Sequence, residues 1–477
     1  MLVHMNKTCF PWILIIGLCI PTLCRADVGL PSEISKAVQQ NGFDNKGIGL
    51  YVREVNSQEP TLAFQANQAL NPASVIKLVT TAASLAQLGQ GYQWTTEVWY
   101  TGTIAKDRLK GDLYLRGNGD PYLTPERFWR MLNRIAIFGI KHINGNVYFD
   151  NRYFDPGKID YAAFDEQPYR TYNVGPNAVL IGFQATEFHF DADDEQVKIT
   201  PFPMSPKLTI NNKVKLVNGR CGAWQKRLDI KPHIVQDGLQ VDFEGRYSRA
   251  CGKRTLYRRV SEVSDHYRHF FLPLWTQIGG TITGKVSEGT LPKNALTVFD
   301  DASISMAEAV RLINKFSNNV MTRQVLLSLG ARISGPPGTT EKGIDAVNTW
   351  LDQTGLNAPN LQLDNGAGLS RETRISAENL GRLLHYVYQQ PYMPEFIASL
   401  PVAGYDGTMA HRFEGEAVHG RAHIKTGLLD FVQTMAGYVT SKSGKRYVLV
   451  MLHNHPRAHT KAAEKLQNEV IRWVYHH

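Results

Sequence analysis

Three short stretches of this chain carry side chains that together could perform acyl transfer. They are Ser74-Val75-Ile76-Lys77, Ser317-Asn318-Asn319 and Lys425-Thr426-Gly427, and each occurs once in the 477 residues. Together they supply two serine hydroxyls, an asparagine amide and two lysine amines. This set is typical of serine enzymes in which a lysine, and not a histidine, takes the proton of the nucleophile.

A serine hydroxyl needs a partner that removes its proton before it can attack a carbonyl carbon at neutral pH. Lys77 follows Ser74 by three residues, which places both side chains on one face of a helix. Burial and a second cation, Lys425, would lower the pKa of Lys77 and let it act as the base. Ser317 would bridge the two lysines and pass the proton to the leaving amine. Lys425 would also supply positive charge for a substrate carboxylate.

The other residues of these stretches suit substrate binding. Asn319 has the donors and the acceptor to hold a substrate amide, and Thr426 can donate to a substrate carboxylate. Gly427 would let the substrate lie close against the edge of a strand. The backbone N–H groups of Ser74 and Leu428 would form an oxyanion hole.

Apolar periodicity indicates which elements hold these residues. A helix is predicted over Leu78–Leu88 with Ser74 at its start, and Lys425 ends a strand predicted over 422–425. Further strands are predicted over 46–54, 60–65, 431–440 and 446–453, and helices over 305–315, 318–329, 341–354, 376–389 and 460–475. The two ends of the chain can thus form one antiparallel sheet with helices on its faces. The stretch between the first two motifs is long enough to hold inserted domains.

The middle of the chain contains two stretches with different sequence patterns. Residues 97–175 contain a predicted strand, helix and strand, whereas nearly all of 183–262 alternates between apolar and polar residues. A helix over 266–278 and a strand over 280–286 follow. The sequence therefore predicts one small α/β insertion and one mostly β insertion.

The first 26 residues are typical of a secretory signal peptide. An apolar run over 10–23 follows Lys7, and small residues occupy the −3 and −1 positions of a cut before Asp27. A membrane anchor is the alternative, but the run is shorter than the ~20 apolar residues of a transmembrane helix. The formal charge is +9, or +7 without Lys7 and Arg25, and it is dispersed along the chain. It predicts attraction to wall or lipid polyanions and does not imply nucleic acid.

Two cysteines, Cys221 and Cys251, lie beyond the predicted signal peptide. In an oxidising compartment they would most simply form a disulfide, with two free buried thiols as the alternative. No CxxC motif or close pair of histidines flanks either cysteine, which argues against a zinc site. His453, His455 and His459 fit no standard ligand spacing, so we expect no metal and no cofactor.

Beyond the three motifs, the chain resembles the class C low-molecular-mass penicillin-binding proteins. These are D-alanyl-D-alanine carboxypeptidases and endopeptidases of the penicillin-binding protein 4 (DacB) type. The resemblance covers essentially the whole chain after the signal peptide. Besides the three motifs it rests on Lys110–Leu113, Gly119–Pro121, Asp364–Arg371 and Leu400–Thr408.

The resemblance implies an α/β (α+β) fold in three domains. The catalytic domain would have the serine β-lactamase/DD-peptidase-like architecture, an antiparallel sheet flanked by helices. Two nested domains, one small α/β and one mostly β, would be inserted into it. The expected boundaries are 1–26 for the signal peptide, 27–96 plus 296–477 for the catalytic domain, 97–175 plus 272–295 for the α/β domain and 176–271 for the β-rich domain.

The resemblance also implies substrate contacts outside the three motifs. Family members that act on diaminopimelate-type wall bind the peptide stem through the arginine after Leu-Ser, here Arg371. They also use a carboxylate of the first inserted domain, which here corresponds to Asp165 or Glu166. The glycine-rich loop 364–368 is expected near the site. Family members often have Ser-Asp-Asn where this chain has 317–319, so only the variable middle position differs.

The implied function is that of a periplasmic serine DD-peptidase. Ser74 would form an acyl-enzyme with D-Ala-D-Ala stems, as a carboxypeptidase, or with D-Ala-diaminopimelate cross-links, as an endopeptidase. Peptidoglycan stem peptides and β-lactam antibiotics are the expected partners, and peripheral membrane or wall association and a homodimer are compatible with the sequence. A β-lactamase shares the motifs, but the long insertion has no obvious purpose there. In a third alternative, an inactive wall-binding scaffold, Ser74→Ala would leave every phenotype intact.

Overall fold

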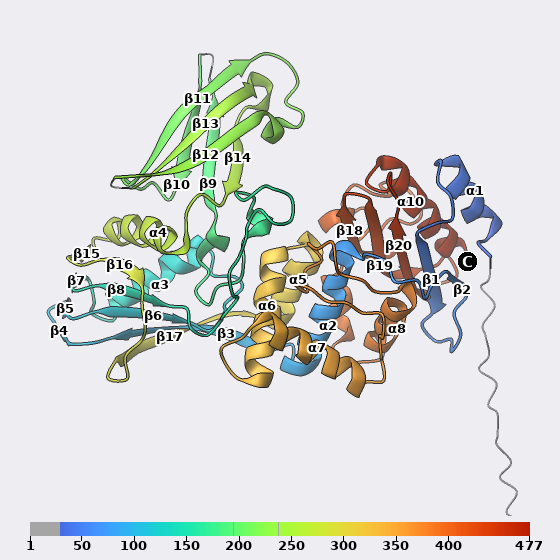
Figure 1. Cartoon of the computed structure of the whole chain (residues 1–477), viewed down its shortest axis with the longest axis horizontal. Coiled ribbons are helices and arrows are strands. Elements are labelled where there is room, and N and C mark those ends of the chain that lie inside the picture. Colours follow the sequence, from blue (N-terminus) through green and yellow to red (C-terminus); the bar gives the residue numbers. More distant parts are fainter. Residues whose placement is uncertain (1–28, 194, 237) are drawn as a thin grey trace, which may run out of the picture.

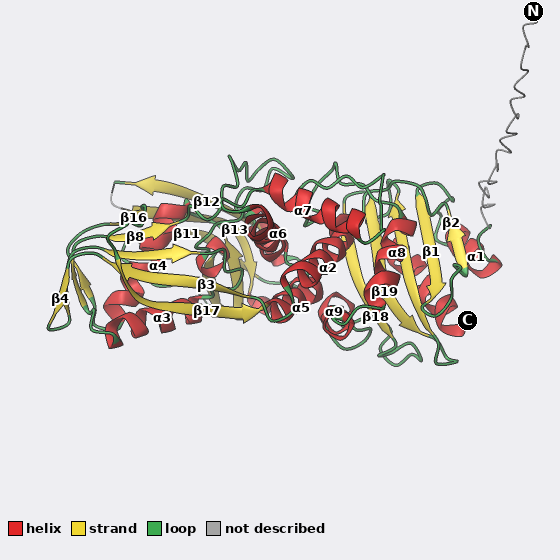
Figure 2. Cartoon of the chain, turned by 90° about the horizontal axis from the view of Figure 1, so that it is seen from below, coloured by secondary structure: helices red, strands yellow, loops and turns green. Residues whose placement is uncertain are grey.

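The computed structural model describes residues 29–193, 195–236 and 238–477, and the predicted signal peptide lies outside them. The described strands form five sheets. A helix-rich part that contains both ends of the described chain lies beside a part dominated by sheets (Figures 1 and 2). Among these residues, every helix is too short or too polar to span a bilayer.

The first and last strands form one antiparallel sheet in the order β18-β19-β20-β1-β2, as the sequence predicted. The bounds are β1 Ile48–Glu54, β2 Leu62–Phe64, β18 Ala422–Leu429, β19 Val432–Thr440 and β20 Arg446–Asn454. β18 extends beyond its predicted end at Lys425, because Thr426 to Leu429 continue the ladder and Leu429 pairs with Val432. The Lys-Thr-Gly motif is therefore held inside a strand.

Helices cover both faces of this sheet (Figure 2). In β20, Val448 and Val450 belong to the apolar core on one face, while Leu449 and Met451 belong to the core on the other. A strand buried on both faces reads as a continuous apolar run, which explains the sequence of β20. The bounds are α1 Ser32–Gln40, α2 Lys77–Leu88, α5 Met306–Phe316, α6 Asn319–Ser334, α7 Thr340–Gln353, α8 Ala377–Tyr388, α9 Met393–Ser399 and α10 Lys461–His476. The sequence predicted these helices except α1 and α9.

The segment between α2 and α5 supplies the other four sheets. Two of them, β16-β8-β6-β3-β17 and β15-β7-β5-β4, pack with α3 and α4 around a core that includes Phe128, Phe149 and Phe271. The strand bounds are β3 Gln93–Tyr100, β4 Thr103–Ala105, β5 Arg108–Lys110, β6 Leu113–Gly117, β7 His142–Asn144, β8 Val147–Asp150, β15 Thr281–Ile282, β16 Val286–Glu288 and β17 Leu296–Ser305. The helix bounds are α3 Pro125–Ile137 and α4 Val263–Gln277.

The sequence did not predict β17, which pairs with β3 and leads into α5. Asp301 of this strand is buried and forms ion pairs with Arg127 and Arg134 of α3. A charged residue on the inner face hides the apolar alternation that marks a strand. Residues 296–305 were expected in the catalytic domain, and the sheet that they join also contains β6 and β8. The division of the chain into domains stays a prediction.

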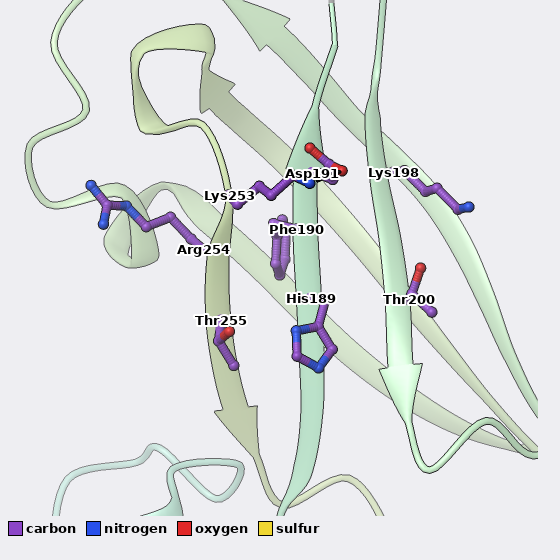
Figure 3. Close-up of a pocket in the computed structure, with 8 residues that line it drawn as sticks. All are labelled: His189, Phe190, Asp191, Lys198, Thr200, Lys253, Arg254 and Thr255. Atoms are coloured by element: carbon purple, nitrogen blue, oxygen red, sulfur yellow. Dashed lines mark ion pairs between the residues drawn. The ribbon is translucent and has the colours of Figure 1, made fainter.

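The remaining two sheets, β10-β9-β14 and β11-β13-β12, form the β-rich part that the sequence predicted (Figure 1). Phe188, Phe190 and Phe243 lie in the core between them. The bounds are β9 Thr186–Ala192, β10 Val197–Phe202, β11 Leu208–Val217, β12 Leu228–Val235, β13 Gly238–Ser248 and β14 Arg254–Arg258. Figure 3 shows a pocket on the first sheet, with residues from or next to all three of its strands.

Cys221 and Cys251 form a disulfide in this β-rich part, across a sequence separation of 30. We expect its reduction to lower the free energy of unfolding of this part by roughly 3–4 kcal/mol, because the unfolded chain gains loop entropy. Thermal unfolding with and without reductant measures the effect. Identical melting curves would contradict the expectation.

Candidate active site

Ser74 lies in a short 3-10 helix, Ala73–Ile76, that runs directly into α2. The N–H of Ala73 donates to Oδ1 of Asn71 at 2.8 Å, and the Asn71 amide donates to the carbonyl of Ser370 at 3.0 Å. Ala73 has φ +46°, a left-handed conformation that is costly for a residue with a side chain. This constrained turn fixes the position of the half-buried Ser74 at the start of α2.

Lys77 is fully buried, and its amine lies against three acceptors. Nζ donates to Oγ of Ser74 at 2.9 Å, to Oδ1 of Asn319 at 2.6 Å and to the carbonyl of Ala367. Burial lowers the pKa of Lys77 well below its ordinary value, and two neighbouring cations lower it further. A lysine in this position can accept the proton of the Ser74 hydroxyl. The contact with Ala367 also confirms that the glycine-rich loop lies at the site.

Ser317 and Lys425 form a second hydroxyl–lysine pair. Lys425 Nζ donates to Oγ of Ser317 at 2.9 Å and to the carbonyl of Thr426 at 2.6 Å. Burial lowers the pKa of Lys425 to about 7, and its charge is one of those that lower the pKa of Lys77. Ser317 follows α5 with φ +57°. In the described part of the chain its hydroxyl bonds to Lys425 and not to Lys77, so the predicted bridge between the lysines is only half formed.

The Lys-Thr-Gly motif lies on an edge strand, since β18 ends its sheet. At the outer edge, the carbonyl of Ala422 and the N–H of Ile424 bond to the loop 401–403. In an antiparallel strand every second residue directs its N–H to the same edge. The N–H groups of Thr426 and Leu428 therefore face the outer edge as well, and Leu428 is 60% exposed.

Gly427 brings this strand close to the nucleophile. A Cβ at this position would lie 2.9 Å from the backbone nitrogen of Ser74 and 2.9 Å from the carbonyl oxygen of Pro72. That carbonyl also accepts a hydrogen bond of 2.7 Å from Thr434 in β19. The N–H groups of Ser74 and Leu428 thus lie on neighbouring segments, as an oxyanion hole requires.

Two residues of the site were missed by sequence reasoning. Arg323 is one of the cations that lower the pKa of Lys77, and burial lowers its own pKa to about 10. It follows Asn319 by one turn of α6, so the i,i+4 spacing could have revealed it. Thr408 accepts a 2.7 Å hydrogen bond from Oγ1 of Thr426. It ends the stretch Leu400–Thr408, but nothing in that sequence assigned it a contact.

Arg371 lies on the loop that follows Ala367. Its guanidinium is 4.7 Å from the ring centroid of Phe164 and forms a 3.4 Å ion pair with Asp430. Phe164 directly precedes the two carboxylates predicted to contact the substrate. The segment that carries them, which belongs to the insertion, therefore reaches the catalytic face.

The two carboxylates lie in different surroundings. Asp165 accepts hydrogen bonds from the Tyr172 hydroxyl at 2.6 Å and from the Asn173 amide at 2.8 Å. Glu166 has φ +58° and lines a cavity along β12. Among the contacts of the described residues, neither carboxylate meets Arg371. The structure thus brings their segment to the site without joining these groups.

The geometry defines a class of enzyme. A serine hydroxyl at the start of a helix contacts a buried lysine of lowered pKa, beside a second hydroxyl–lysine pair and an edge strand with outward N–H groups. Such a site can transfer a proton from the serine, bind the oxyanion and hold an acyl ester on the serine. It is the site of a serine acyl-transfer enzyme of the Ser-x-x-Lys type.

The chain belongs to the D-Ala-D-Ala carboxypeptidase 3 (S13) family, which it matches over residues 30–475. It is therefore an enzyme of the serine DD-carboxypeptidase class, as the resemblance implied. The family provides the substrate chemistry for the acyl transfer that the site geometry allows.

Relatives of known identity match along nearly the whole chain. The D-alanyl-D-alanine carboxypeptidase of Actinomadura sp. (strain R39) is 27% identical over 444 residues, which are 89% of this chain and 81% of that protein. The D-alanyl-D-alanine carboxypeptidase DacB of Haemophilus influenzae is 22% identical over 448 residues, or 93% and 91% of the two chains. The crystal structure of penicillin binding protein 4 (dacB) from Haemophilus influenzae superposes with a TM-score of 0.77 at 20% identity, over 93% of this chain and 99% of that one. This likeness confirms the predicted fold class.

Proposed function

We propose that this enzyme is a DD-peptidase of peptidoglycan that acts through an acyl-enzyme on Ser74. The hydroxyl oxygen attacks the carbonyl carbon of the penultimate D-Ala, and the amide C–N bond then breaks. The leaving group is the terminal D-Ala of a stem, or the neighbouring stem of a cross-link. Water hydrolyses the ester and restores the Ser74 hydroxyl. The observation that carries the proposal is the 2.9 Å contact between Ser74 and the buried Lys77.

The two hydroxyl–lysine pairs divide the proton transfers between them. Lys77 takes the proton of the Ser74 hydroxyl, since burial lowers its pKa and so favours its neutral form. Ser317, which is hydrogen-bonded to Lys425, delivers its proton to the leaving amine and then receives a proton from Lys425. The N–H groups of Ser74 and Leu428 hold the oxyanion, for which loss of one donor typically costs about 3 kcal/mol.

The substrate lies along β18 in this proposal. Thr426 and Lys425 receive the carboxylate of the leaving group, Asn319 holds an amide of the stem, and Gly427 lets the stem approach the strand. Arg371, with the ring of Phe164 beside it, binds a carboxylate further along the stem. Asp165, or its neighbour Glu166, contributes at the same end of the site if the stem displaces its present contacts.

Penicillin should acylate the same serine, and the resulting ester should hydrolyse slowly. The experiment is to mix the purified protein with a D-Ala-D-Ala-terminated stem peptide and, separately, with labelled benzylpenicillin. We expect release of D-Ala and a penicilloyl-enzyme that lasts on the order of hours. Release of the label within about milliseconds to seconds would indicate a β-lactamase instead. If neither reaction occurs, the protein is an inactive scaffold.

We also propose that the enzyme works in the periplasm, against the wall. The formal charge of +9 supports attraction to anionic wall polymers or lipid headgroups. Lys198, Lys253 and Arg254 gather on the β-rich part at the pocket of Figure 3, which is a suitable contact surface. Fractionation of cells that express the full chain tests the location.

A further inference from the structure

A groove opens from the catalytic Ser317 and Asn319 toward the inserted sheets. It has a volume of about 570 Å³, within the range of cavities that bury molecules of several residues. The terminal D-Ala that a carboxypeptidase releases is far too small to fill it. The groove is therefore built for more than the reaction on an uncross-linked stem.

The far wall of the groove comes from the β-rich part. Tyr257 of β14, Phe202 of β10 and Glu187 of β9 all line it, together with Phe316 at the end of α5. Tyr257 and Phe316 are 50% and 67% exposed, so both rings offer free faces to a ligand. In Figure 1 the ends of β9 and β14 lie next to the loops at the centre of the molecule, where the two parts meet. The inserted sheet thus forms part of a surface that is continuous with the catalytic site.

The charged side chains that line the groove are all acidic. Glu126 and Glu187 line it, and none of its lining residues is a lysine, arginine or histidine, although the whole protein is basic. Both carboxylates act on Tyr257, whose pKa is raised first by burial and then by Glu187 and Glu126. Just outside the lining, His189 lies 3.3 Å from Glu187 and would neutralise it only when protonated. A ligand with free carboxylates is therefore disfavoured at this wall, and a neutral or cationic one is favoured.

The position of Ser317 decides which part of a substrate meets the groove. Because Ser317 gives its proton to the leaving amine, the groove lies on the leaving side of the scissile bond. In the proposed function, Thr426 and Lys425 on β18 receive the carboxylate beside the leaving amine, and the loop of Arg371 lies on the acyl side. A chain that continues beyond the leaving amine would run past Phe316 and into the groove.

We propose that this groove binds the leaving strand of a cross-linked substrate, with Tyr257 and Phe316 as apolar contacts. Beyond the carboxylate that Thr426 and Lys425 receive, Glu126 and Glu187 select strands whose further carboxyl groups are amidated over strands that carry them free. This specificity rests on the proposed function, because it assigns the leaving side from the role of Ser317.

The test compares three reactions of the purified enzyme. The first is cleavage of a cross-linked dimer whose leaving strand is amidated at every carboxyl group except the one beside the leaving amine. The second is cleavage of the same dimer with free carboxylates, and the third is release of D-Ala from a single stem. We expect wild type to prefer the amidated dimer several-fold. Tyr257→Ala should lower kcat/KM for the amidated dimer about tenfold, while D-Ala release and penicillin acylation stay unchanged. Trp129→Ala on α3, 44% exposed and outside the groove, is the matched control and should change nothing.

The charge is tested separately by the double variant Glu126→Gln/Glu187→Gln, which should abolish the preference for the amidated strand. Equal losses in all three reactions, or no loss with Tyr257→Ala, would overturn the groove as a subsite. A preference that survives in the double variant would overturn the role of the carboxylates. A wild-type enzyme that cleaves neither stem nor dimer would instead contradict the proposed function itself.

Discussion

Replacing Lys77 by methionine should lower the rate of penicillin acylation and of D-Ala release by about a thousandfold to ten-thousandfold. Methionine keeps most of the length and apolar volume of the lysine but cannot take the proton from the Ser74 hydroxyl. Single-turnover acylation measured with labelled penicillin gives the ratio. A variant that retains more than about a tenth of the wild-type rate would show that another group is the base.

The same substitution should also change how the free energy of unfolding depends on pH. The folded state lowers the pKa of Lys77 well below the ordinary value of 10.5, so the unfolded chain binds more protons between the two values. Stability contributed by this group therefore rises with pH across that window and is lowest below the folded pKa. Relative to Lys77→Met, wild type should gain free energy of unfolding as the pH rises toward 10.5, as measured by urea unfolding. Parallel curves for the two proteins would contradict the lowered pKa.

Lys342→Met serves as the control for both measurements. Lys342 on α7 also donates to backbone carbonyls, those of Gly335 and Pro337, but lies outside the site. We expect its acylation rate to equal that of wild type. A rate loss in this variant would show that removal of a half-buried lysine damages the enzyme in general.

Replacing Gly427 by alanine should lower acylation by about a hundredfold. The added Cβ would press on the Ser74 backbone nitrogen, the Pro72 carbonyl and the Thr434 hydroxyl at once. All three fix the turn that carries the nucleophile, and a displacement of about 1 Å at a reacting atom costs about that factor. Gly91→Ala is the matched control, because a Cβ there meets nothing within 4 Å. Equal rates for both variants would mean that β18 does not position Ser74.

The three motifs could be predicted from sequence because each is local. Ser74 and Lys77 are joined by one helical turn, and the apolar runs around Lys425 mark a strand wherever it folds. Strands were predicted near both ends of the chain, and we expected them to form one sheet. The structure confirms this sheet. Such patterns depend on neighbours in the chain, which the sequence displays directly.

The remaining parts of the site depend on contacts between distant segments. Arg323 acts through Lys77, and Thr408 acts through Thr426. The spacing of Arg323 from Asn319 is the one local sign of its role, and no pattern near Thr408 predicts its contact. β17 was missed because its buried Asp301 is neutralised by arginines of α3, more than 150 residues earlier in the chain. The contact of Phe164 with Arg371 likewise joins the insertion to the catalytic face, which only the folded chain reveals.

The most direct measurement is the intact mass of the protein after exposure to benzylpenicillin, followed by peptide mapping of the adduct. One penicilloyl group per chain, on the peptide that contains Ser74 and absent from Ser74→Ala, is the result we predict. An adduct on any other peptide, or none at all on a folded protein, would contradict Ser74 as the nucleophile.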